Sequence, residues 1–215
     1  IIAFDATVPV TQAFGDVAAT GSAAVTAHRD HRHGMPAHTD HIAGGIVHYD
    51  YVVDPNIAVS PTTYTVSTGA TVIGYATIQG AINAADAANA DSSILINEGT
   101  YIENVTIPAT FAHKLWLVGE GYGKVLLEPT TGTALSILST SREMWFKNLY
   151  FAGDGSSYSV NTTGANAAAH FEDCYFVRKV GGDFALASFR RCEFFSGYAV
   201  DAVGFTPSSV QFADC

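Results

Sequence analysis

The segment Phe146-Lys-Asn-Leu149 recurs as Phe171-Glu-Asp-Cys174, Phe189-Arg-Arg-Cys192 and Phe212-Ala-Asp-Cys215, and this repeat is the clearest indication of the fold. Each copy places an aromatic side chain three residues before a small or medium-sized apolar one. Successive copies begin 25, 18 and 23 residues apart, which is the length of one coil in a solenoid whose coils stack on one another. The repeat predicts an interior column of Leu149, Cys174, Cys192 and Cys215.

The three cysteines are predicted to be free, buried thiols in this column. They cannot all pair within the chain, and none has the CxxC spacing of a zinc or redox site. Stacked coils lie about 4.8 Å apart, so a disulfide between neighbouring coils is possible but would be strained. A packed thiol behaves as a small apolar side chain.

Composition indicates a folded protein and excludes some partners. Hydrophobic residues make up 48% of the 215 residues, which is enough for a substantial core. The chain has 20 acidic and 10 basic side chains, a formal charge of −10, so it lacks the basic surface that nucleic-acid binding needs. No run of about 18 apolar residues occurs, and we expect no membrane span.

The chain divides into three predicted parts. Residues 1–48 are expected to be an extended attachment or stem segment with a histidine-rich loop, and residues 49–75 a linker or short β-hairpin. Residues 76–215 are expected to form the solenoid. The sequence begins without Met or a basic signal region and ends at Cys215 inside a repeat copy. We therefore expect the solenoid to be incomplete at its C-terminal end and the natural polypeptide to extend further.

A helix is predicted to precede the first coil. Apolar residues recur at helical spacing between Thr77 and Asn89, with Thr77 as the N-cap; they are Ile78, Ala81, Ile82 and Ala85. Short β-type runs follow from Ser93 onward, separated by Gly, Asn or Pro.

Three segments resemble a known fold family. They are Thr77-Ile-Gln-Gly-Ala-Ile-Asn-Ala-Ala85, Asn97-Glu-Gly-Thr-Tyr-Ile-Glu-Asn-Val105 and Leu117-Val-Gly-Glu-Gly121. Together they are similar to the opening of the right-handed parallel β-helix proteins of the pectin lyase-like superfamily. The resemblance implies an all-β, right-handed parallel β-helix with an N-terminal capping helix. Enzymes and non-enzymatic adhesins share this scaffold, so the resemblance implies a fold and not an activity.

The N-terminal part resembles a different group of proteins. Thr11-Gln-Ala-Phe-Gly-Asp16, Ala18-Ala-Thr-Gly-Ser-Ala23 and Ala27-His-Arg-Asp-His-Arg-His-Gly-Met-Pro36 are similar to a segment of tailed-bacteriophage tail fibres. The resemblance implies a structural virion protein, a tail-fibre or tailspike-like appendage that forms a homotrimer. Its expected partners are other tail or baseplate proteins and a host surface polysaccharide or receptor. Its expected location is the surface of the virion.

Histidines cluster in the last part of this segment and just after it, and they form the candidate metal site. Residues two apart on an extended strand point to the same side, so His31 and His33 offer two imidazoles in one direction. The tail-fibre resemblance implies that three such pairs meet on a trimer axis, where six nitrogens suit a divalent transition metal such as iron. Two alternatives remain open: a zinc site within one chain using His28, His38 or His41, and solvated loop residues.

The sequence favours a binding role over a catalytic one, although a polysaccharide-degrading β-helix enzyme, pectinesterase-like or lyase-like, stays an alternative. Pectin methylesterases use two aspartates, and here Gly182-Asp183-Phe184 resembles only the second aspartate motif. Asp154 and Asp173, the substitutes for the first, look like turn residues. A bacterial surface adhesin is a further alternative. Four tyrosines either line a saccharide groove or cover coil edges: Tyr150, Tyr158, Tyr175 and Tyr198.

Overall fold

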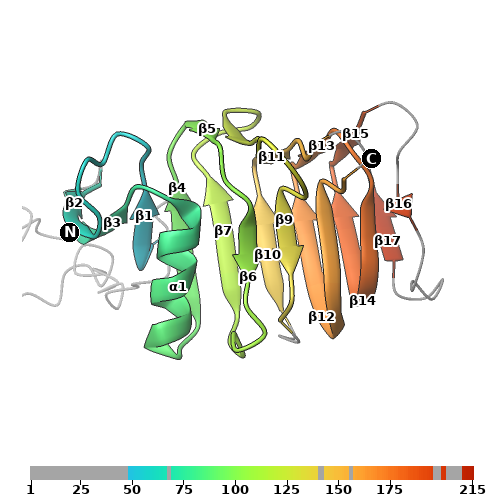
Figure 1. The fold of residues 1–215 in the computed structure, drawn as a ribbon, viewed down its shortest axis with the longest axis horizontal. Coiled ribbons are helices and arrows are strands. Elements are labelled where there is room, and N and C mark those ends of the chain that lie inside the picture. The colour runs from blue at the N-terminus through green and yellow to red at the C-terminus, as the bar shows by residue number, and fades with distance from the viewer. Residues whose placement is uncertain (1–47, 67–68, 140–142, 155–156, 196–199, 202–209) are drawn as a thin grey trace, which may run out of the picture.

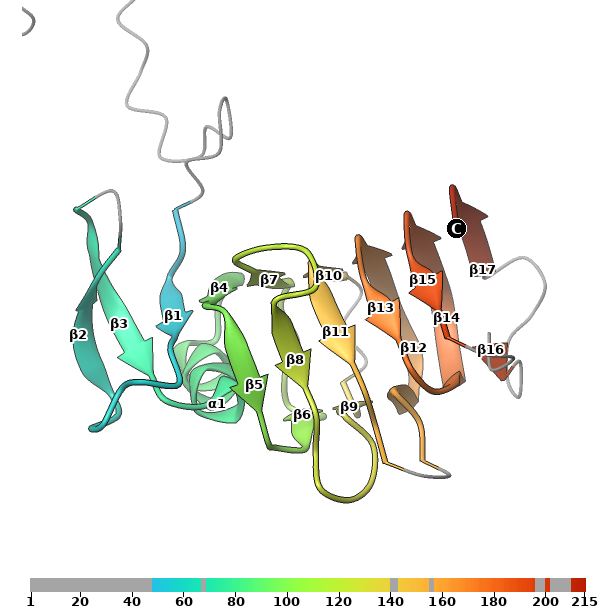
Figure 2. The same ribbon diagram turned by 90° about the horizontal axis from the view of Figure 1, so that it is seen from above.

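The computed structural model describes residues 48–66, 69–139, 143–154, 157–195, 200–201 and 210–215. Within these residues the chain winds into stacked coils with three faces (Figures 1 and 2). Face A carries β1 (Tyr51–Val53), β4 (Ser92–Ile96), β7 (Leu115–Gly119), β10 (Met144–Lys147) and β17 (Val210–Ala213). Face B carries β5 (Gly99–Tyr101), β8 (Val125–Leu127), β11 (Leu149–Phe151), β13 (Tyr175–Phe176) and β15 (Glu193–Phe194). Face C carries β6 (Val105–Ile107), β9 (Leu135–Ile137) and β16 (Val200–Asp201).

Two long strands join faces C and A. The first residues of β12 (Val160–Glu172) pair with β9, and its last residues pair with β10. The next coil repeats this course in β14 (Val180–Arg190), which pairs with β12 along both faces. Every pairing between successive coils is parallel. The predicted fold class, a right-handed parallel β-helix, is therefore confirmed.

The repeated phenylalanines form one interior column on face A. Phe146 pairs with Phe171, Phe171 with Phe189, and Phe189 with Phe212. Their ring centroids are 4.9, 5.1 and 5.1 Å apart, in stacked orientation. The spacings of the sequence repeat are thus the lengths of the coils. Each stacked pair stabilises the column by about 0.5–1.5 kcal/mol beyond the burial of apolar area.

In each of the four repeat copies, a residue with left-handed backbone geometry follows the strand of face A. The φ angles are 57° at Asn148, 53° at Asp173, 50° at Arg191 and 58° at Asp214. Asn and Asp adopt this conformation more readily than other residues with a side chain. Asn148 also donates from Nδ2 to the Gly119 carbonyl, 3.2 Å away, one coil earlier. The residue after each turn is the small apolar residue of the repeat.

The cysteines stack as free thiols at these corners, but the expectation that all three are buried is wrong for Cys215. The Sγ atoms of Cys174, Cys192 and Cys215 lie 3.4 Å from a phenylalanine carbonyl one coil earlier, in the same way each time. Cys174 and Cys192 are buried because a further coil packs over each of them. Cys215 is exposed, and no described residue packs over it.

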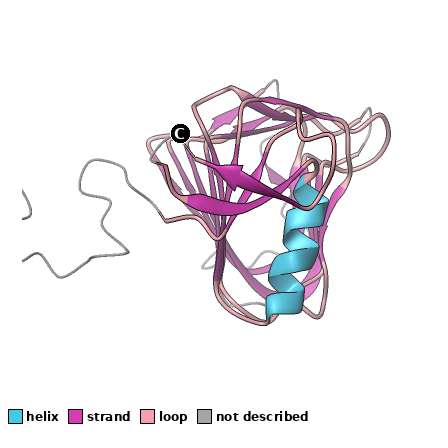
Figure 3. Cartoon of the chain, turned by 90° about the vertical axis from the view of Figure 1, so that its left-hand side faces the viewer, coloured by secondary structure: helices cyan, strands magenta, loops and turns pink. Residues whose placement is uncertain are grey.

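Helix α1 (Ile78–Ala88) caps the first coil, as predicted (Figure 3). Its buried stripe is the predicted one, and Thr77 Oγ1 accepts from the Gly80 amide at 3.1 Å. A further cap comes from the first coil, since the Glu103 carboxylate accepts from the Ile78 and Gln79 amides at 2.8 and 3.1 Å. A carboxylate at a helix N-terminus accepts hydrogen bonds from free amides and interacts favourably with the positive end of the helix dipole. Glu103 belongs to one of the segments that resemble β-helix proteins, and its hydrogen bonds join helix α1 to the first coil.

Face A continues beyond the cap. β1 pairs in parallel with β4 and with β3 (Thr71–Tyr75), and β3 forms an antiparallel hairpin with β2 (Thr62–Thr65). None of the helices among the described residues is long and apolar enough to span a membrane. The histidine-rich loop up to residue 47, and with it the predicted stem, lies outside the described residues.

Candidate functional site

An outward row of aromatic rings on face A is the most distinctive surface feature of the solenoid. Side chains alternate between the two sides of a strand, so the residue before each interior ring points outward. On three successive coils that residue is Trp116, Trp145 and His170, which are in direct register. We call these three residues the outer aromatic row.

The rings of this row stack on one another. The centroids of Trp116 and Trp145 are 4.8 Å apart with an interplanar angle of 4°. The Trp145 and His170 centroids are 5.3 Å apart at 18°. All three side chains are partly exposed. Among the described rings none stacks on the other side of Trp116, where the register partner is Ser93.

Coil stacking does not require aromatic side chains at these positions. The same row continues through Ser93 on the coil before Trp116 and through Ser188 and Gln211 on the coils after His170. On face A the strands that carry these residues keep direct register with the neighbouring coils. The three rings consequently add a surface feature to a fold that is already stabilised by its interior column.

Charged side chains flank the row on both sides. On one side Lys114 forms an ion pair with Glu143 at 2.5 Å, and its Nζ lies 5.9 Å from the Trp145 ring centroid. On the other side Lys147 pairs with Glu172 at 3.6 Å. Arg191 binds Glu172 and forms two hydrogen bonds to Asp173, at 2.7 and 2.9 Å. A bidentate guanidinium–carboxylate pair holds both groups in a defined orientation.

Local interactions set the charge of these groups. The hydrogen bond from Arg191 lowers the pKa of Asp173, and the hydrogen bond to Glu143 raises the pKa of Lys114. Burial lowers the pKa of His170, while Glu143 acts in the opposite direction. Nδ1 of His170 lies 2.7 Å from Ser188 Oγ. At neutral pH the row therefore combines a neutral imidazole with permanently charged neighbours.

This arrangement is suited to binding an extended ligand along the coils. Aromatic rings offer apolar area, and the indole N–H and the flanking charges offer hydrogen bonds. A sheet of stacked coils keeps these groups at fixed spacing, so little conformational entropy is lost on binding.

Asp183, the candidate catalytic residue, lies elsewhere. It is exposed on β14, directly after Gly182 at the bend from face C to face A. No described residue forms a hydrogen bond with its carboxylate. The two substitutes for its partner are turn residues: Asp173 is the left-handed corner bound to Arg191, and Asp154 Oδ2 accepts from the Gly132 amide at 3.1 Å.

The candidate metal ligands His31 and His33, and the alternatives His28, His38 and His41, lie outside the described residues, as does Tyr198. Within the described part of the chain no group of three or more His, Cys, Asp or Glu side chains could hold a metal ion.

The remaining tyrosines lie away from the outer aromatic row. Tyr150 and Tyr175 stack at 4.7 Å and 6° on the outside of face B. Tyr158 lies under Lys179, whose Nζ is 4.4 Å from the ring centroid. These three rings do not meet the tryptophans of face A.

The outer aromatic row was not recognised as a site from the sequence, although a signal for it exists. Trp116, Trp145 and His170 each stand one position before the interior residue of their coil, which is Leu117, Phe146 and Phe171. Aligning the repeat copies by that interior residue and comparing the preceding position would have brought the three rings together.

Comparison with known proteins places the chain near one solved structure. It is similar to the pectin methylesterase in a crystal structure of that enzyme in complex with hexasaccharide VII, with a TM-score of 0.48 and 16% sequence identity. The similarity covers 69% of this chain and 56% of the esterase chain, so the chain spans little more than half the length of that protein. No family model and no curated protein matches the chain.

Proposed function

We propose that this chain is a structural virion protein, a tail-fibre or tailspike-like appendage that contributes to host attachment. In this proposal the outer aromatic row contacts a polysaccharide of the host surface. The observation that carries it is the stack of Trp116, Trp145 and His170 on consecutive coils, flanked by ion pairs on a rigid sheet.

Such an appendage acts through its rigidity. Each coil pairs with its neighbours and buries apolar side chains against them, including a continuous column of phenylalanines. Burial stabilises a solenoid by about 25 cal/mol per Å² of apolar area, and the energy is shared between neighbouring coils. A rigid rod of this kind transmits force and presents a repeating surface to a repeating polymer.

The proposal extends to assembly and metal binding. The tail-fibre resemblance of residues 11–36 supports a homotrimer attached to other tail or baseplate proteins. His31 and His33 of three chains would then hold a divalent transition metal, iron or zinc, on the trimer axis. Replacing both histidines with alanine is expected to reduce bound metal, measured by elemental analysis, and the trimer fraction, measured by native mass spectrometry. Unchanged values would remove the metal cage from the proposal.

Polysaccharide binding is tested by removing rings from the outer aromatic row. Trp116→Ala and Trp145→Ala should each weaken binding to an array of immobilised bacterial surface polysaccharides. A buried tryptophan contact is worth about 2 kcal/mol or more on truncation, which corresponds to roughly a 30-fold weaker affinity.

Tyr150→Ala is the matched control, because it removes an outward stacked ring of face B. It should leave polysaccharide binding unchanged. Equal losses for Tyr150→Ala and the two tryptophan variants, or no binding by the parent chain to any polysaccharide of the array, would refute the proposed role of face A. Labelling of virion tails by antibodies against this chain tests the virion assignment separately.

A further inference from the structure

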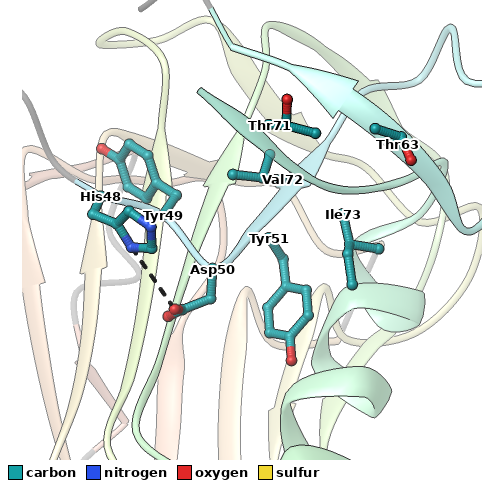
Figure 4. A pocket seen from close by; sticks show the side chains of 8 residues that line it. All are labelled: His48, Tyr49, Asp50, Tyr51, Thr63, Thr71, Val72 and Ile73. Carbon is teal, nitrogen blue, oxygen red and sulfur yellow. Dashed lines mark ion pairs between the residues drawn. The ribbon is translucent and has the colours of Figure 1, made fainter. Parts of the chain in front are cut away.

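A hollow lies at the N-terminal end of the solenoid, between β1 and the β2–β3 hairpin (Figure 4). Its volume is about 410 Å³, within the range of small-molecule sites. The residues that line it are His48, Tyr49, Asp50, Tyr51, Thr63, Thr71, Val72 and Ile73. It is separate from the outer aromatic row, which begins two coils further along face A.

The floor of the hollow belongs to the inner side of face A. Tyr51 pairs with Ile94 of the next coil and with Ile73 of β3. Ile94 is completely buried in the core, whereas Ile73 is 48% exposed. Within the described part of the chain, the inner side of the sheet is therefore only partly covered at this end, and the apolar side chain of Ile73 is exposed near Tyr51.

Hydroxyl groups surround this apolar floor. Thr63 pairs with Ile73 and therefore lies on the same side of the sheet, and Thr71 precedes Ile73 by two residues. Burial raises the pKa values of Tyr49 and Tyr51, so both phenols stay protonated and can donate hydrogen bonds. The Tyr51 ring is held edge-on against Tyr75, with 5.9 Å between centroids.

A fixed carboxylate completes the lining. Asp50 Oδ2 accepts hydrogen bonds from the amide and the hydroxyl of Ser93, at 2.7 and 2.9 Å. These bonds orient the carboxylate and leave Oδ1 turned toward His48, whose Nδ1 is 4.0 Å away (Figure 4). The hollow thus has one carboxylate in its lining, with the imidazole of His48 beside it.

We propose that this hollow binds a neutral saccharide unit. A pyranose ring has an apolar C–H face that fits beside Tyr51 and Ile73, and hydroxyl groups that pair with Asp50, Thr63 and Thr71. Aromatic area combined with a few fixed polar groups is the usual lining of such small-molecule sites. The carboxylate of Asp50 disfavours anionic ligands through like-charge repulsion.

Saturation-transfer NMR tests this proposal on the whole chain. The probes are the methyl glycosides of glucose, galactose and N-acetylglucosamine, with glucuronate as the charged comparison. At least one neutral glycoside should receive saturation and glucuronate should not. Asp50→Asn should weaken the bound glycoside about tenfold, as expected for the loss of a hydrogen bond to a charged group.

Ile73→Arg should abolish binding because the long side chain fills the hollow from an exposed position. Ile102→Arg is the matched control, since Ile102 is 68% exposed and lies outside the hollow. The proposal is overturned if no neutral glycoside binds, if glucuronate binds in preference, or if Ile73→Arg and Ile102→Arg behave alike. The outer aromatic row does not enter this test, so the two sites can fail independently.

Discussion

Replacing Phe171 with leucine should destabilise the solenoid by removing the middle ring of the interior column. Phe171 is 1% exposed and stacks on Phe146 at 4.9 Å and on Phe189 at 5.1 Å. Leucine retains most of the apolar volume but neither stacked pair. At about 0.5–1.5 kcal/mol for each pair, we expect a loss of about 1–3 kcal/mol, whereas Phe171→Ala should cost about 3–5 kcal/mol because it also leaves a cavity.

Equilibrium urea unfolding followed by tryptophan fluorescence measures this loss, since Trp145 lies on the coil next to Phe171. The midpoint should fall while the slope stays constant. Phe212→Leu is the control: Phe212 is 52% exposed and has one stacked neighbour, Phe189. With one stacked pair lost instead of two, it should cost about half as much as Phe171→Leu. Equal losses for Phe171→Leu and Phe212→Leu would refute the reasoning that stacking in the interior stabilises the column.

Three further predictions follow from the corners and bends of the coils. Gly182 has φ +103°, and an added Cβ would lie 1.9 Å from the Thr162 carbonyl oxygen, so Gly182→Ala should cost at least about 2 kcal/mol; an unchanged melting temperature would contradict this. Because Arg191 lowers the pKa of Asp173, their pair stabilises the fold above the pKa of an unfolded aspartate, about 3.9, and this stabilisation is lost as pH falls through the folded-state value. Arg191→Gln should thus lower the urea midpoint at pH 7 but not near pH 2, and an equal decrease at both values would exclude the pair as the cause. In native protein a thiol reagent should modify Cys215 alone, and the two buried cysteines should react only after unfolding; three rapid thiols in the native state would show that the column is open.

The coil architecture could be predicted because its signals are local in the sequence. A ring three residues before a small apolar residue is a pattern of one strand, one turn and the start of the next strand. In the solenoid each coil contacts only its neighbours, so the spacing between copies is also the spacing between paired residues, as Phe146, Phe171 and Phe189 show. Capping by Thr77 is equally local, since an N-cap acts within one turn of its helix.

The candidate sites could not be predicted in the same way, because their members come together only through the register of the strands. Trp116 and Trp145 are separated by a coil that contains two other faces and their loops. The hollow requires that Tyr51 and Ile73 share one side of a sheet that is left partly uncovered. Composition and spacing describe which side chains exist, but not which of them stay exposed.

Repeating local patterns and hydrophobic burial were sufficient to predict a winding chain with an interior ladder, a capping helix and free thiols. The alignment of three rings on the outside of face A, and the part of the inner sheet side that the described residues leave uncovered, became apparent in the folded structure. These features depend on which coil packs over which residue. The coil that covers a side chain is distant from it in the sequence, so the burial of that side chain is a property of the assembled stack.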